Sequence, residues 1–311
     1  MSAPASESNG IMGHKNDGFK EEQIPVPWGH ISGKWWGPKG IQPIIALHGR
    51  EDNASTFDKL MPLIPDDISI LCLDLPGHGF SSHCSEGHYY FVHWEGLMLL
   101  RRIIKYFKWN KVKLMGHSLG GAISFLYAAA YPDEVEFLIC LDIASPNVRN
   151  ITHIANITGD HIDRYLKYEC LTPESIPCYE YDEMINIVLE AYKGDITRES
   201  AEILMRRGMQ PASKPGFYHF SRDPRLKVSM LGMLSMDLVM AFAARIKCNY
   251  LNIRAVPGYP LEQPENYDKV MNQIKLGAKK FVYKHVEGSH HVHLNNPERI
   301  APIIQEFLST L

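Results

Sequence analysis

The residue of this chain best suited to nucleophilic chemistry is a serine between two glycines. Ser118 lies in the run GHSLG at residues 116–120, which matches the pattern G-x-S-x-G. The apolar run VKLM at 112–115 precedes it, and the run LGGAISFLYAAAYP follows it with the periodicity of a helix. Such a sharp turn from strand to helix strains the serine backbone, and glycines flank it because larger side chains would clash. We therefore predict that Ser118 is a nucleophile.

A serine hydroxyl attacks a carbonyl group only when a base accepts its proton, so a histidine is expected on another loop. Among the 15 histidines, His290 is the best candidate, because it follows the last predicted strand in the run VEGSH and precedes the last predicted helix. His291 and His293 stand beside it, but no acidic or cysteine residue lies near them at the sequence spacing of metal ligands. We therefore expect no metal and interpret His291 and His293 as loop and packing residues.

The negative charge that develops on a tetrahedral intermediate requires backbone N–H donors. The amide of Leu119, directly after the serine, is one candidate donor. The run LHGR at 47–50 ends an earlier strand with a glycine, which makes the amide of Arg50 the second candidate. We therefore expect the backbone amides of Arg50 and Leu119 to form an oxyanion hole.

A carboxylate must orient the histidine, and the chain offers two candidates. Asp142 emerges directly from the end of a predicted strand, although an aspartate there often caps a turn. Glu262 follows the strand predicted at 250–256, but Pro257 and Pro260 restrict the backbone before it. We favour Asp142, because a strand end is a rigid platform, and keep Glu262 as the alternative acid.

The segments that position these residues alternate between short apolar runs and runs with helical periodicity. The predicted strands are 43–47, 68–73, 112–115, 137–141, 250–256 and 280–286. A hairpin is predicted at 24–36, a helix at 95–107 and a last helix near 298–308. Buried strands that alternate with helices predict an α/β fold with a mostly parallel sheet.

The alternation stops near residue 144, and about a hundred residues with helical patterning follow before it resumes. We therefore predict a core formed by residues 24–144 and 246–311, with a helical cap at 145–245 inserted between two strands. Residues 1–23 are predicted to be a flexible leader, because they begin with small and polar residues and lack the apolar region of a signal peptide.

Composition excludes several classes of partner. The 32 basic and 35 acidic residues give a formal net charge of −3, so no basic field for nucleic acid is expected. No apolar stretch is long enough to span a membrane. We expect a small, apolar acyl compound as the partner, no cofactor, and an oligomeric state that the sequence leaves open. The six cysteines form no CxxC pair, which favours a cytoplasmic location, with the peroxisome as an alternative suggested by the terminal Ser-Thr-Leu.

Taken together, these motifs resemble the α/β-hydrolase superfamily over nearly the whole chain after residue 24. The resemblance rests on the strand that ends in HG, the run LDLPGHGFS at 73–81, the run GHSLGG and the run GSHHVHLNNPERIAPII near the end. The runs IPVPWGHISGKWWGP, SRDPRL at 221–226 and AVPGY at 255–259 are similar to the animal serine hydrolase-like proteins, called kraken-like in insects. The resemblance implies an α/β-hydrolase fold and a Ser-His-acid hydrolase in which Ser118 and His290 are nucleophile and base.

The chain departs from the family pattern at two positions. Relatives usually carry an aromatic residue where this chain has Arg50, and an aspartate near Glu262. The guanidinium of Arg50 could hold an anionic substrate group, although we favour pairing with Glu51 or Asp52 at the surface. We expect a carboxylesterase-like serine hydrolase that cleaves a carboxylic ester or related acyl substrate through an acyl-enzyme. The alternative is a ligand-binding protein on a hydrolase scaffold with slow or no turnover.

Overall fold

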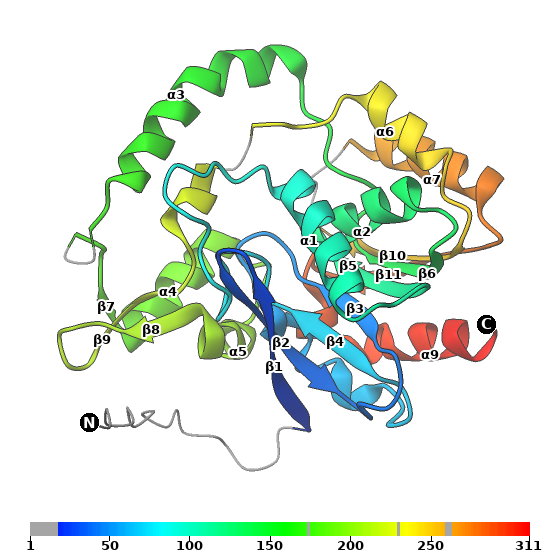
Figure 1. The fold of residues 1–311 in the computed structure, drawn as a ribbon, viewed down its shortest axis with the longest axis horizontal. Coiled ribbons are helices and arrows are strands. Elements are labelled where there is room, and N and C mark those ends of the chain that lie inside the picture. Colours follow the sequence, from blue (N-terminus) through cyan, green and yellow to red (C-terminus); the bar gives the residue numbers. More distant parts are fainter. Residues whose placement is uncertain (1–17, 173–174, 229–230, 259–262) are drawn as a thin grey trace, which may run out of the picture.

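A mostly parallel sheet of eight strands forms the centre of the computed structural model, which describes residues 18–172, 175–228, 231–258 and 263–311 (Figure 1). Its strands are β1 (Phe19–Val26), β2 (Gly29–Trp36), β3 (Ile44–Leu47), β4 (Ile70–Leu73), β5 (Val112–His117), β6 (Val135–Leu141), β10 (Asn249–Pro257) and β11 (Lys280–Gly288). They lie in the order β1-β2-β4-β3-β5-β6-β10-β11. Strand β1 pairs antiparallel with β2, and β2 pairs antiparallel with β4. All other neighbouring strands of this sheet are parallel.

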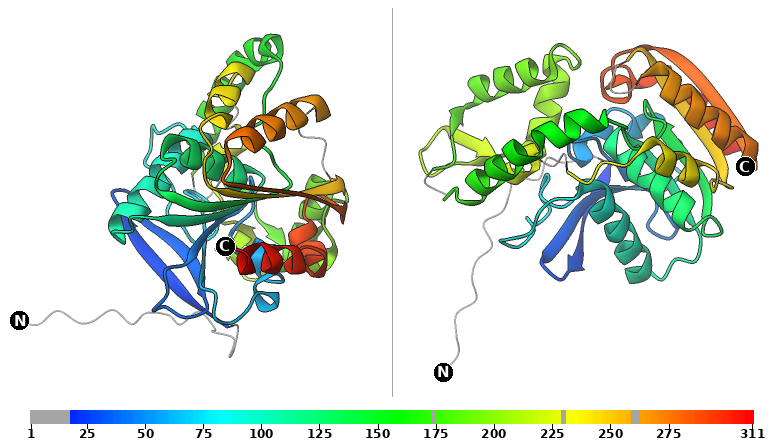
Figure 2. Two further views of the ribbon diagram at one scale, coloured as in Figure 1. Left: turned by 90° about the vertical axis from the view of Figure 1, so that its right-hand side faces the viewer. Right: turned by 90° about the horizontal axis from the view of Figure 1, so that it is seen from above.

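Helices cover both faces of this sheet, as the views in Figure 2 show. One face packs against α1 (Val92–Tyr106), α2 (Leu119–Ala130), α6 (Met236–Ala243) and α7 (Pro264–Gly277). The other face packs against the 3₁₀ helices η1 (Ala54–Phe57) and η2 (Met61–Leu63), and against α8 (Val292–Asn295) and α9 (Ala301–Ser309), between which η4 (Pro297–Arg299) lies. Because both faces are covered, β3 and β4 are buried at every position. The predicted α/β architecture is confirmed.

A second unit lies between β6 and β10. It contains α3 (Ile151–Glu169), α4 (Tyr181–Tyr192), α5 (Arg198–Gly208), η3 (Pro224–Val228) and a small sheet of β7 (Tyr179–Glu180), β9 (Phe217–Phe220) and β8 (Met209–Pro211). Helices α4 and α5 share an apolar cluster of their own, which includes Met184, Val188 and Leu204. Helix α6 differs from them, because it packs into the main core with α2 and α7.

A buried ion pair joins this unit to the carboxyl end of β4. The guanidinium of Arg207, in α5, contacts Oδ2 of Asp74 through Nη2 at 2.7 Å and through Nε at 3.0 Å, and both side chains are almost fully buried. The same carboxylate accepts hydrogen bonds from the backbone amides of Ala54 and Phe80. Removal of one partner from a buried ion pair is strongly destabilising, because the other charge is then left buried without compensation.

We expect Arg207→Met to lower the free energy of unfolding by about 3 to 5 kcal/mol, because it leaves Asp74 buried without its cation. Urea denaturation followed by circular dichroism measures the loss. The matched control is Arg198→Met, which removes an exposed arginine paired with Asp182 and Glu202. Surface pairs of that kind contribute little, so the control should unfold like the parent chain. Equal losses in the two variants would contradict a special role for the buried pair.

Within the ranges that the structure describes, no helix is both long enough and apolar enough to cross a membrane.

Candidate active site

Ser118 occupies the turn between β5 and α2 in a strained backbone conformation. Its φ and ψ are 50° and −117°, in a region that non-glycine residues rarely adopt. The turn is tight, since a Cβ atom on Gly116 would lie 2.3 Å from the backbone of Gly120, and one on Gly120 would lie 2.1 Å from the carbonyl oxygen of Leu47. The amide of Ser118 donates to the carbonyl of Leu141 at 3.2 Å. These contacts explain why glycines stand two residues either side of the serine.

Asp142 and His290 form a short hydrogen bond at the same edge of the sheet. Oδ2 of Asp142 lies 2.6 Å from Nδ1 of His290, and both side chains are buried. Asp142 directly follows β6 with a φ of 50°, and its Oδ1 accepts the amide of Ala255 at 2.8 Å. Its own amide donates to the carbonyl of Ile253 at 2.7 Å. Because β6 and β10 hold the carboxylate from both sides, its orientation toward His290 is fixed.

The other candidate acid, Glu262, lies outside the residues that the structure describes. Ser118, Asp142 and His290 each follow directly on a strand or lie within two residues of one, namely β5, β6 and β11. The carboxyl ends of parallel strands share one edge of a sheet, which is the usual place for a site in such folds.

The loop after β3 carries the predicted donor Arg50, and Leu119 is the first residue of α2. A backbone amide in the first turn of a helix has no acceptor within that helix. The loop after β3 is held by His48, whose Nδ1 donates to the carbonyl of Gly49 at 2.7 Å and whose Nε2 accepts the amide of Leu75 at 2.9 Å. Burial lowers the pKa of His48, so the ring is neutral and can make both bonds. The sequence showed the turn but not this role of His48.

The side chain of Arg50 lies near the surface beside Glu51. Its Nη2 is 3.3 Å from Oε1 of Glu51 and donates to the carbonyl of Lys227 at 3.2 Å. Arg222 contacts the other oxygen of the same carboxylate at 2.6 Å. The surface pairing expected from the sequence is therefore the arrangement observed, with Glu51 as the partner.

A cavity of about 100 Å³ opens beside Ser118. Its wall consists of apolar side chains with a few polar ones: Val92, Leu119, Ala122, Ile143, Met233, Arg50, His93, Asn147 and Arg149. A second cavity of about 310 Å³ adjoins it and shares Arg50 and Arg149 with it. A larger depression of about 610 Å³ lies at the opposite edge of the sheet, against the amino ends of β3 and β6, and is remote from the serine.

His291 lies between two carboxylates just behind this site. Its Nε2 is 3.1 Å from Oδ2 of Asp52, and its Nδ1 bonds to Oδ2 of Asp195. Burial by itself lowers the pKa of His291, but the two carboxylates outweigh burial and raise it to about 9. Asp195 also accepts the amide of His290 at 2.7 Å, so it supports the histidine loop from the segment between α4 and α5. His291 is buried in its loop, as expected, but no pattern in the sequence indicated its two acidic partners, because they come from distant parts of the chain.

The comparisons with known proteins agree with this architecture. A family model described as "alpha/beta hydrolase fold" matches residues 42–158. A "Probable serine hydrolase" of Drosophila melanogaster is 50% identical over 292 residues, which cover 94% of this chain and 88% of that protein. The chain belongs to the serine hydrolase-like family of α/β hydrolases. The human "Serine hydrolase-like protein 2", another relative, is 30% identical over 93% of this chain and 94% of its own length.

Solved structures resemble this member of the family over nearly its whole length. A hypothetical protein from Pseudomonas aeruginosa superposes with a TM-score of 0.80 at 27% identity, covering 93% of this chain and 98% of that one. A thioesterase domain from the curacin biosynthetic pathway superposes with a TM-score of 0.76 at 19% identity, covering 93% and 99%. The second likeness shows the fold alone. The resemblance inferred from the sequence motifs is thus confirmed.

Two residues in the cavity wall of this family member were not singled out by the sequence. Burial lowers the pKa of His93 to about 4, so a neutral imidazole faces the space beside Ser118. Arg149 is exposed, and no ion pair within the described part of the chain involves it. Neither residue stands in a recognisable motif, and only the fold brings them to the serine.

Proposed function

We propose that the chain is a serine hydrolase that cleaves a carboxylic ester or related acyl compound through an acyl-enzyme intermediate. Ser118 is the nucleophile, His290 the general base and Asp142 the acid of this proposal. The observation that carries it is the 2.6 Å hydrogen bond between Asp142 and His290, at the sheet edge where the strained Ser118 lies. The membership of a family of serine hydrolase-like proteins supports it as well.

The proposed reaction follows the general serine hydrolase scheme. The bond to Asp142 occupies Nδ1 of His290, so Nε2 accepts the proton as Oγ of Ser118 attacks the carbonyl carbon. The protonated imidazole then transfers this proton to the departing alcohol oxygen. Water hydrolyses the acyl-enzyme in the same way, which regenerates the serine and releases the acid. Asp142 remains ionised and stabilises the charged imidazole.

The oxyanion of each tetrahedral intermediate would be bound by two backbone amides. Leu119 supplies one from the first turn of α2, where the helix dipole also favours negative charge. Arg50 supplies the other from the loop that His48 holds. This assignment depends on the backbone, so substitution of the Arg50 side chain should leave the donor in place.

The predicted cap, residues 145–245, would cover the acyl group. Asn147, Arg149 and Met233 come from this segment and line the cavity beside Ser118. The apolar side chains that share the wall with them favour an apolar acyl chain.

The test is hydrolysis of a series of p-nitrophenyl esters by the parent chain and by Ser118→Ala. Turnover by the parent that the variant lacks would support the hydrolase. Equal and slow release in both proteins would favour the ligand-binding alternative, and saturable binding of the esters by both would then be expected.

We expect Arg149→Gln to lower kcat/KM for esters with a carboxylate on the acyl chain about tenfold relative to neutral esters. The reason is that a guanidinium without an ion-pair partner can donate charge-assisted hydrogen bonds to an anionic substrate. Arg50→Trp should change the same ratio much less, since Glu51 already holds that guanidinium. Paired assays on neutral and anionic esters measure the ratio. A larger effect of Arg50→Trp would move the anion contact to Arg50.

A further inference from the structure

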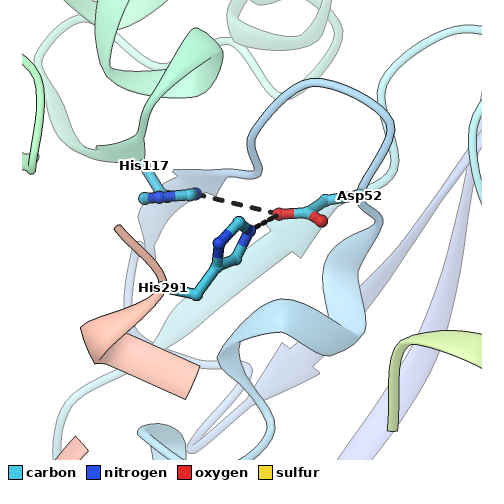
Figure 3. A group of neighbouring side chains, drawn as sticks. All are labelled: Asp52, His117 and His291. Atoms are coloured by element: carbon cyan, nitrogen blue, oxygen red, sulfur yellow. Dashed lines mark hydrogen bonds and ion pairs between the residues drawn. The ribbon is translucent and has the colours of Figure 1, made fainter. Parts of the chain in front are cut away.

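Three segments that carry the proposed catalytic residues each place one polar side chain at a common buried point (Figure 3). Asp52 follows Arg50 by two residues, His117 precedes Ser118, and His291 follows His290. Oδ2 of Asp52, Nδ1 of His117 and Nε2 of His291 all lie within 4.8 Å of one another. The three side chains are almost fully buried.

Each of the three has a partner that leaves a ligand atom turned toward this point. Nε2 of His117 donates to the carbonyl of His290 at 3.0 Å, which leaves Nδ1 as the atom with the free electron pair. Nδ1 of His291 bonds to Asp195, and Nε2 faces Asp52. Oδ1 of Asp52 accepts the hydroxyl of Tyr192 at 2.5 Å, and Oδ2 faces the two rings. Metal-binding histidines and carboxylates carry such supporting hydrogen bonds as a rule.

One of these atoms has no hydrogen-bond partner among the described residues. Nδ1 of His117 is fully buried and lies 3.8 Å from Oδ2 of Asp52, so two electron-pair donors face each other. Because Nε2 of the same ring donates to the carbonyl of His290, Nδ1 carries the electron pair and not the proton. An unpartnered polar atom in the interior is costly, and a cation between the two atoms would give Nδ1 of His117 a partner.

The spacing of the three atoms suits a small divalent cation. A tetrahedral zinc ion with bonds of about 2.0 to 2.1 Å holds its ligand atoms about 3.3 Å apart. Oδ2 of Asp52 lies 3.1 Å from Nε2 of His291 and 3.8 Å from Nδ1 of His117, and the two ring nitrogens lie within 4.8 Å of each other. Gly49 keeps this point open, because a Cβ atom there would lie 2.8 Å from Nδ1 of His117 and 3.2 Å from Oδ2 of Asp52.

We propose that Asp52, His117 and His291 bind a zinc ion that cross-links the three segments carrying the proposed catalytic residues. Two imidazoles and one carboxylate are common zinc ligands, and water completes the tetrahedron. Zinc takes the place of the ring proton that His291 otherwise shares with Asp52, so one proton is released on binding. The sequence gives no sign of this site, because Asp52 lies more than two hundred residues before His291. The proposal does not depend on catalysis.

The first experiment is metal analysis of the full chain, expressed with added zinc and then dialysed. We expect about one zinc per chain for the parent and less than about 0.2 for Asp52→Asn and His291→Gln. Zinc should also raise the Tm of the parent by about 5 °C and leave that of the two variants unchanged. No zinc in the parent would overturn the proposal, and so would one equivalent of iron in its place.

A second cluster provides the matched control. Cys84, His88 and Glu95 also bring three ligand atoms within 4.8 Å of one another, near the surface. His88→Gln should keep its zinc if the proposal holds. Loss of zinc in His88→Gln, with retention in His291→Gln, would place the metal at the second cluster and overturn the proposal.

Cobalt spectroscopy tests the site by a signal that is gained and not by the loss of bound zinc. Cobalt(II) bound by Asp52, His117 and His291 should give visible bands but no thiolate-to-cobalt absorption, whereas binding at the second cluster would involve Cys84. The variant Asp52→Cys should gain the thiolate band, because it replaces an oxygen ligand with sulfur. A thiolate band in the parent, or none in a folded Asp52→Cys that binds cobalt, would overturn the assignment.

Discussion

Ser118→Ala should lower kcat for ester hydrolysis by about 10⁴-fold or more, because it removes the attacking oxygen while the amides of the oxyanion loop remain. The variant should fold normally, since alanine occupies the same backbone conformation and the change removes one atom. Initial rates with p-nitrophenyl esters measure the loss. Thermal unfolding of both proteins checks that the fold is retained.

A fluorophosphonate probe gives an independent readout of the same residue. It should label the parent at Ser118, as located by mass spectrometry of peptides. The control is Ser124→Ala, which removes a buried hydroxyl that donates to the carbonyl of Gly120 in the same helix. This control should be labelled like the parent. Labelling that persists in Ser118→Ala would exclude Ser118 as the nucleophile.

Asp142→Asn should lower kcat by about 10³ to 10⁴-fold with little change in KM. Asparagine has nearly the same shape, but it lacks the charge that stabilises the imidazolium and favours the wrong tautomer of His290. Steady-state kinetics on a neutral ester separate the two parameters. Because Asp142 accepts a hydrogen bond from the amide of Ala255, circular dichroism should confirm that the strand ends are undisturbed.

Glu262→Gln is the control for this second prediction, since it removes the other candidate acid, and it should cost only a few fold. A large loss of kcat in Glu262→Gln, together with an unchanged kcat in Asp142→Asn, would assign the role of the acid to Glu262. Normal rates in both variants would indicate a slow hydrolase that works with Ser118 and His290 alone, or a binding protein.

Most of the sheet could be predicted from the sequence because its strands are local patterns. The apolar runs at 112–115 and 137–141 became β5 (Val112–His117) and β6 (Val135–Leu141), and the helix predicted at 95–107 became α1 (Val92–Tyr106). A buried strand that is followed by a glycine and then by apolar residues at helical spacing can be recognised within a window of about a dozen residues. The small sheet β7-β9-β8 could not be found in this way, because its strands have two to four residues.

The candidate site was predictable in so far as its residues stand in local motifs. Ser118 and His290 each have a recognisable sequence neighbourhood, whereas the acid was left between Asp142 and Glu262. Two strands far apart in the chain hold Asp142 toward His290, and no local pattern records such a contact. The partners of His291 were missed for the same reason, because Asp52 and Asp195 reach it only in the folded chain.

The size of the cavity beside Ser118 bears on which substrates could be distinguished. The cavity beside Ser118 has about 100 Å³, roughly a third of the about 310 Å³ of the cavity that adjoins it. Arg50 and Arg149 line both cavities, so they lie where a longer acyl chain would extend from the first toward the second. For the proposed hydrolase, these two arginines would make substrate binding selective for the length of the acyl chain.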